Sequence, residues 1–218
     1  MTGDAVAVAS NAPGRSRWWW AVAAGALAAV PLGWLLSYAA TLMMLLGLFF
    51  FVLFGLVIGA VMYRYGSPAR PIPSRRIKLG VALVVLIGWG ISYGVEVRDF
   101  PIDKANDAIR VVSPLPEGMT REEFKADVER FVRDTLAERY GGSGPIGYAR
   151  WVLAEKQIEY PVETMLKPIV LTATQGRWLW STRVTLSIVL LAFGIYSQVS
   201  PLRKVSEDSN AEEPAVPV

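Results

Sequence analysis

The chain has 218 residues, of which 53% are hydrophobic and 19% are charged, and its formal net charge is +3. It contains neither cysteine nor histidine, which excludes disulfides, thiolate nucleophiles, Cys-ligated metal centres, imidazole bases and His-ligated haem. The apolar residues gather in long stretches without charge, which is typical of an integral membrane protein and not of a soluble domain.

Residues 1–17 are polar or small, and we expect them to form a disordered cytoplasmic N-terminus. The charge-free run that follows, residues 18–63, is too long for one membrane span, which takes about 20 residues. It predicts transmembrane helices 1 and 2, joined as a hairpin at the small and polar residues 37–41. A cleaved signal peptide is the alternative for the first span, but the apolar part of such a peptide is only about 7–15 residues long.

Two further apolar runs, residues 79–95 and 183–202, predict transmembrane helices 3 and 4. Residues 64–78 form a basic, proline-rich loop between helices 2 and 3, and we expect it to be extended and cytoplasmic. Basic residues in short loops determine topology because they stay in the cytoplasm, and this loop carries five: Arg64, Arg70, Arg75, Arg76 and Lys78. Both termini, including a disordered tail over 203–218, are then cytoplasmic, and residues 96–182 are extracytoplasmic.

The predicted fold class is therefore membrane all-α, with four transmembrane helices and a small α+β extracytoplasmic domain inserted between helices 3 and 4. The excess of arginine over lysine favours a bacterial source, and hence the inner membrane, because outer membranes use β-barrels. The basic residues are explained by topology and by contact with the lipid bilayer, so we expect no nucleic acid partner.

An amphipathic helix over residues 120–140 is the strongest local signal in the predicted outer domain. Thr120 and Glu123 have the spacing of a capping box, and Gly141 with Gly142 would end the helix. Four apolar residues share one helical face: Phe124, Val128, Phe131 and Leu136. We expect this face to be buried inside the domain against residues 146–153 and 169–171, because its opposite face carries balanced charge rather than lysine and arginine alone.

Weaker signals predict the remaining elements of the domain. A short helix is expected from Asp99 to about Ala108, because proline and acidic residues favour a helix start, and a strand over 109–113. A second helix is expected over about 146–159 and a strand over 169–174.

Glycines four residues apart suggest close helix packing within the membrane. Gly55 with Gly59, and Gly90 with Gly94, are both G-x-x-x-G pairs, which let helix backbones approach closely. We expect these faces to pack within one chain or to support self-association or a protein partner.

Three sequence patterns raise the possibility of chemistry, and each has a simpler explanation. Residues 90–94 match the G-x-S-x-G pattern of serine hydrolases, but Ser92 has no histidine base in this chain and lies in a predicted helix. Residues 142–147 match G-x-G-x-x-G, yet they follow a helix rather than a strand. Asp99, Asp103 and Asp107 could meet on one helical face around a cation, although acidic residues at a helix start need no metal.

These patterns predict no catalytic residue, cofactor or metal site. We therefore expect a non-catalytic accessory, assembly or interaction subunit that presents its outer domain to a partner. A membrane enzyme is the alternative, with Glu155, Glu159 and Glu163 as candidate acids and bases. A subunit of a transporter or channel is a third hypothesis, although the apolar runs 18–63, 79–95 and 184–202 contain no charged residue.

Overall fold

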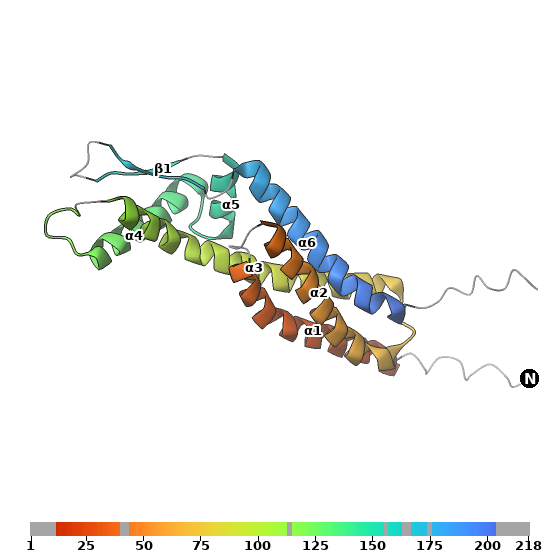
Figure 1. Cartoon of the computed structure of the whole chain (residues 1–218). Coiled ribbons are helices and arrows are strands. Elements are labelled where there is room, and N and C mark those ends of the chain that lie inside the picture. The colour runs from red at the N-terminus through yellow and green to blue at the C-terminus, as the bar shows by residue number, and fades with distance from the viewer. Residues whose placement is uncertain are drawn as a thin grey trace, which may run out of the picture. The chain divides into compact units, whose positions relative to one another are not determined.

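The computed structural model is mostly helical, and it describes residues 12–39, 44–112, 115–154, 157–162, 167–173 and 176–203 (Figure 1). Its helices are α1 (Ala12–Ala39), α2 (Met44–Gly66), α3 (Ser74–Val111), α4 (Arg121–Tyr140), α5 (Pro145–Ala154) and α6 (Arg177–Val199). Two 3₁₀ turns, η1 (Ser67–Ala69) and η2 (Ser200–Leu202), follow α2 and α6. The strands are β1 (Ile158–Tyr160) and β2 (Ile169–Leu171).

Four of these helices, α1, α2, α3 and α6, are long and apolar enough to cross a membrane, which confirms the predicted number of spans. The helix α1 begins at Ala12, before the predicted start at residue 18, and the predicted hairpin turn lies partly outside the described residues. The basic loop is only partly extended, because α2 continues to Gly66, η1 follows it, and α3 begins at Ser74.

The chain divides into two compact units. The first unit comprises Met1–Leu32, Phe49–Gly88 and Ile188–Val218, and it contains most of the apolar length of the four long helices. The second comprises Gly33–Leu48 and Trp89–Ser187, and it contains the predicted outer domain with the adjoining ends of α3 and α6. Each unit has its own core.

Three segments meet at one end of the first unit. The indole nitrogen of Trp18 on α1 donates a hydrogen bond to the carbonyl of Arg76 at the start of α3, at 3.2 Å. The amide of Ile72 donates to the carbonyl of Leu202 at 3.0 Å, and the Arg70 guanidinium donates to the carbonyl of Pro201 at 2.7 Å. The start of α1, the loop between α2 and α3, and the end of α6 therefore lie together, as four alternating spans require.

In the second unit, α3 is one continuous helix, and two of the predictions for this segment were wrong. No new helix begins at Asp99, because α3 runs through Pro101, and residues 109–111 are helical rather than a strand. The reason is tertiary packing: buried residues of this segment keep helical spacing, and they are Val97, Phe100, Ala105, Ala108 and Val112. Burial of this stripe outweighs the local preference of β-branched residues for a strand.

The amphipathic helix α4 agrees with its prediction in detail. Thr120 accepts from the amide of Glu123, and the Glu123 carboxylate accepts from the amide of Thr120, so the capping box is present. Gly141 ends the helix with a φ of 77°, a left-handed conformation that glycine adopts without strain. On the apolar face Phe124, Val128 and Leu136 are fully buried, and they belong to the domain core.

The helix α4 packs against α5 and β1, which confirms that its apolar face is buried within the domain (Figure 1). Phe131 is only partly buried, and its ring meets that of Tyr160 on β1 edge to face at 5.2 Å between centroids. The strand β1 was not predicted. It pairs antiparallel with β2, with Glu159 opposite Val170, and α5 consequently ends at Ala154 rather than at residue 159.

Candidate functional site

A cluster of polar and aromatic side chains joins α3, α5 and α6 within the second unit. We call it the junction cluster, and it consists of Tyr93, Glu96, Tyr148, Trp180 and Arg183. Oε1 of Glu96 accepts a hydrogen bond from the Arg183 guanidinium at 2.6 Å and a second one from the Tyr148 hydroxyl at 3.1 Å. Glu96 is the first charge after the apolar run of α3, and Arg183 is the last charge before the apolar run of α6. Their ion pair therefore links α3 to α6 within the second unit.

The ion pair is well shielded from water. The side chains of Arg183 and Glu96 are 14% and 25% exposed, so their attraction is screened less than that of a surface pair. Burial raises the pKa of the Tyr148 hydroxyl, and the neighbouring Glu96 carboxylate raises it further by its charge and its hydrogen bond. The phenol consequently stays protonated at physiological pH and donates to Glu96. This hydrogen bond fixes geometry, since a phenol that holds its proton so firmly is a poor general acid and its phenolate is not populated to act as a base.

Aromatic rings complete the junction cluster. The Tyr93 hydroxyl donates to the carbonyl of Pro145, the first residue of α5, at 2.8 Å. The Tyr93 ring lies 6.1 Å from the Tyr148 ring and 6.4 Å from the Trp180 ring, between centroids. Contacts of this kind add to the burial of apolar area and favour one arrangement of the three helices.

The sequence reasoning did not identify the junction cluster. It treated Glu96 and Arg183 as the ends of apolar runs, although opposite charges at facing ends of two spans are a usable signal for an ion pair. Tyr148 carried no such signal, because its distance from Glu96 depends on how α5 packs.

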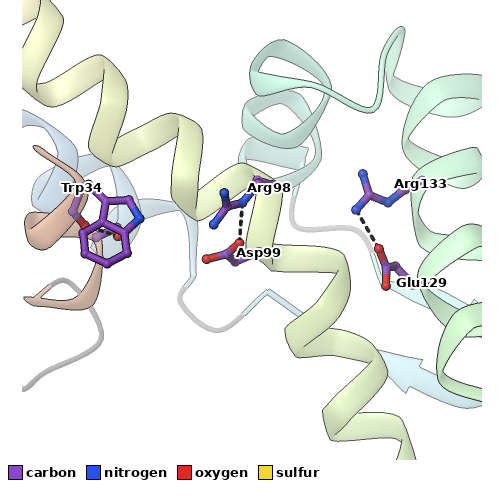
Figure 2. A network of polar contacts seen from close by, with 6 residues as sticks. Trp34, Arg98, Asp99, Glu129 and Arg133 are labelled. Atoms are coloured by element: carbon purple, nitrogen blue, oxygen red, sulfur yellow. Dashed lines mark hydrogen bonds and ion pairs between the residues drawn. The ribbon is translucent and has the colours of Figure 1, made fainter. Parts of the chain in front are cut away.

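Two of the three aspartates considered for a cation, Asp99 and Asp107, each have a basic partner on α3. The Asp99 carboxylate accepts from the neighbouring Arg98 at 2.8 Å (Figure 2), and the Asp107 carboxylate accepts from Lys104 at 3.1 Å. Figure 2 also shows an ion pair of Glu129 with Arg133, four residues apart on α4, at 2.7 Å. Within the described part of the chain, no group of three acidic residues is arranged to hold a metal ion.

The serine pattern lies on a continuous helix. Ser92 is 5% exposed in the middle of α3, whereas the hydrolase motif needs a sharp turn between a strand and a helix. The glycine-rich segment after α4 is a tight turn, since a Cβ on Gly147 would overlap the carbonyl oxygen of Gly142. Of the three glutamates considered for catalysis, Glu159 is exposed on β1, and Glu155 and Glu163 lie outside the described residues.

The four glycines singled out by the sequence have two different environments. A Cβ on Gly55 would lie 2.7 Å from the carbonyl oxygen of Leu191, and one on Gly59 would lie 2.8 Å from that of Ile195. The helix α2 therefore approaches α6 closely, and Gly194 on α6, which the sequence reasoning missed, lies opposite Gly55. In contrast, the positions of a Cβ on Gly90 and Gly94 have no atom of the described structure within 4 Å.

The residues of the basic loop are mostly solvent-accessible in the structure. Arg64, Arg70, Arg75 and Lys78 are exposed, and Arg76 is half-buried. Arg70 is also held in place, because it donates to Pro201 and its guanidinium lies 5.4 Å from the centroid of the Tyr63 ring. This arrangement leaves most of the positive charge free to face water or lipid headgroups.

Comparison of the chain with protein-family models, with curated proteins and with solved structures gave no match.

Proposed function

We propose that this chain is a non-catalytic accessory, assembly or interaction subunit of a cell membrane, and that its outer domain binds or positions a protein partner. One observation carries the proposal: the domain is packed directly on the ends of the two helices that bear it. The ion pair of Glu96 with Arg183 and the contacts of Tyr93 belong to the same unit as the domain core. A domain attached in this way holds its surface in a fixed orientation to the adjoining ends of α3 and α6, as positioning a partner requires.

The orientation that we propose follows from the basic loop. Arg64, Arg70, Arg75, Arg76 and Lys78 favour the cytoplasm for this loop, and hence the extracytoplasmic side for residues 96–182. Contacts at one end of the first unit support it, because they bring the start of α1 and the end of α6 beside this loop. Reporter fusions at residue 70 and at the C-terminus should report the cytoplasm, and one near Ser143 should report the opposite side. A cytoplasmic signal at Ser143 would overturn this orientation.

Two surfaces are available to a partner. Val170 is 46% exposed on the outer face of β2, opposite Glu159 on β1, and a two-stranded sheet has an unpaired edge on each side. Gly90 and Gly94 have open space beside them on α3, whereas Gly55 and Gly59 already contact α6. Self-association through small-residue helix faces would therefore use Gly90 and Gly94.

Photocrosslinking in the native membrane tests the proposal. A benzophenone amino acid placed at Val170 or at Gly90 should yield specific crosslinked species, and the same probe at the exposed Lys78 provides a matched control. Crosslinks at Val170 or Gly90 that are missing at Lys78 would support a partner. A protein that stays uncrosslinked at both positions, and is a monodisperse monomer after extraction in mild detergent, would contradict it.

A further inference from the structure

We propose that the N-terminal end of α5 inserts into the membrane interface, so that Ile146 contacts lipid while the C-terminal end of the same helix stands in water. The proposal concerns a lipid surface, and it holds whether or not the outer domain also binds a protein. It rests on the position of α5 along α3 and on what α5 leaves exposed.

The position of α5 along the axis of α3, and hence its depth relative to the bilayer, follows from three successive contacts between the two helices. Pro145 accepts from the Tyr93 hydroxyl at 2.8 Å, and Tyr148 donates to Glu96 at 3.1 Å. One turn further along both helices, the rings of Trp151 and Phe100 are 4.8 Å apart. The two helices therefore run in the same direction, and α5 begins at the level where the apolar run of α3 ends.

The Tyr93 side chain places this start within the interface rather than above it. Tyr93 precedes Glu96, so it still belongs to the charge-free run of residues 79–95. Side chains on a helix tilt toward its N-terminus, which for α3 is the direction of the bilayer interior. The carbonyl that Tyr93 binds, that of Pro145, consequently lies no farther from the bilayer than Glu96.

The outward face of α5 suits this position. Its buried face consists of Tyr148, Trp151 and Val152, whereas Ile146 is 66% exposed. Arg150 and Leu153 are exposed on the same side as Ile146. Because a helix rises about 1.5 Å per residue, Arg150 lies about 6 Å and Leu153 about 10 Å beyond Ile146 along the helix axis. The order from the membrane outward is an isoleucine, then an arginine at headgroup depth, then a leucine in water.

A second exposed group at the same level supports a lipid contact. Trp178 is 75% exposed and Leu179 is 46% exposed on the first turn of α6, next to Trp180, which packs on Tyr93. Tryptophan is enriched where a protein surface crosses the headgroup layer, because its ring is apolar and its N–H is polar. Water would be an unfavourable environment for Trp178 and Ile146, and the lipid interface suits both.

The absence of native cysteine makes a site-specific test direct. Single variants Ile146→Cys, Arg150→Cys, Leu153→Cys and Val170→Cys would carry a nitroxide label in vesicles of phosphatidylcholine and phosphatidylglycerol. Power saturation compares collisions with oxygen, which concentrates in the bilayer, against collisions with a nickel chelate, which stays in water. All four positions are exposed. Arg150→Cys also removes the hydrogen bond from the Arg150 guanidinium to the carbonyl of Tyr140, so circular dichroism of each variant checks that the fold is kept, and the comparison of residues 146 and 170 does not depend on this variant.

We expect the ratio of oxygen to nickel collisions to be severalfold higher at residue 146 than at residue 170, with residue 150 intermediate and residue 153 close to residue 170. Equal ratios at 146 and 170 would overturn the proposal. A label at 146 that is shielded from both reagents would show a protein contact instead of lipid and would also overturn it. Equal lipid exposure at 146 and 153 would mean that α5 lies flat on the membrane, contrary to the proposed depth order.

Discussion

The contact of α2 with α6 gives the sharpest prediction of stability, which is that Gly55→Ala destabilises the first unit. A Cβ at this position would lie 2.7 Å from the Leu191 carbonyl oxygen and 3.0 Å from the Gly194 Cα. Both obstacles are backbone atoms, so no side-chain rotation relieves them. Moving them to ordinary contact at 3.4 Å requires the two helices to separate by about 0.4–0.7 Å.

The expected magnitude combines two opposing effects. Overpacking of a close interface costs about 1–3 kcal/mol. Alanine in a helix is favoured over glycine by about 0.5–1 kcal/mol, which offsets part of that cost. We therefore expect Gly55→Ala to lower the free energy of unfolding by up to about 2.5 kcal/mol, and by about 1–3 kcal/mol relative to a glycine-to-alanine change at an open site.

Gly90→Ala is the matched control, because nothing in the described structure lies within 4 Å of its Cβ position. Within one chain only the helix preference acts there, so in monomeric protein this variant should be neutral or more stable by up to about 1 kcal/mol. Unfolding of the purified protein in mixed micelles, followed by tryptophan fluorescence, measures both variants. If the Gly55→Ala variant is as stable as the Gly90→Ala variant, the inference that α2 and α6 approach too closely for a Cβ at residue 55 is refuted.

Three further predictions concern the outer domain. Glu96→Gln leaves the shielded Arg183 without its counter-charge and should lower domain stability by about 1–3 kcal/mol in chemical denaturation; no change would show that the ion pair does not fasten the domain. The capping box lowers the pKa of Glu123, so its stabilising effect is present above the unfolded pKa and is lost as pH falls through the lower, folded value. Thr120→Ala should cost about 1 kcal/mol near neutral pH, because it removes the side-chain half of the cap. Glu123→Gln should remove the acid dependence of amide exchange in the first turn of α4, because it removes the titrating carboxylate to which the amide and the hydroxyl of Thr120 donate; an unchanged pH profile would refute the linkage. Burial raises the pKa of Tyr148 and of Tyr160, so the stability they provide is present below the ordinary tyrosine pKa of 10.0 and is lost as pH rises above it. In the native protein both side chains should therefore form tyrosinate, measured by ultraviolet absorbance, only at higher pH than in urea. Coincident titration curves would contradict their burial.

The sequence by itself determined the features that depend on composition and on local periodicity. A run of apolar residues without charge has few alternatives to a membrane helix, because each unpaired backbone group in lipid is costly. The four spans could therefore be predicted directly. The helix α4 could be predicted equally well, since its cap, its apolar stripe and its terminal glycine all lie within one segment.

Tertiary structure decided the features that depend on which segments meet. The helix α3 continues to Val111 because its last turns face the domain core, although their β-branched residues favour a strand locally. Identical G-x-x-x-G patterns separated into a packed pair on α2 and an open pair on α3, because the glycine face of α2 lies against α6 whereas no other segment of the described structure lies within 4 Å of the glycine face of α3. The junction of Glu96 with Arg183 and Tyr148 joins residues far apart in the chain, and such a contact is set by packing geometry that no local pattern encodes.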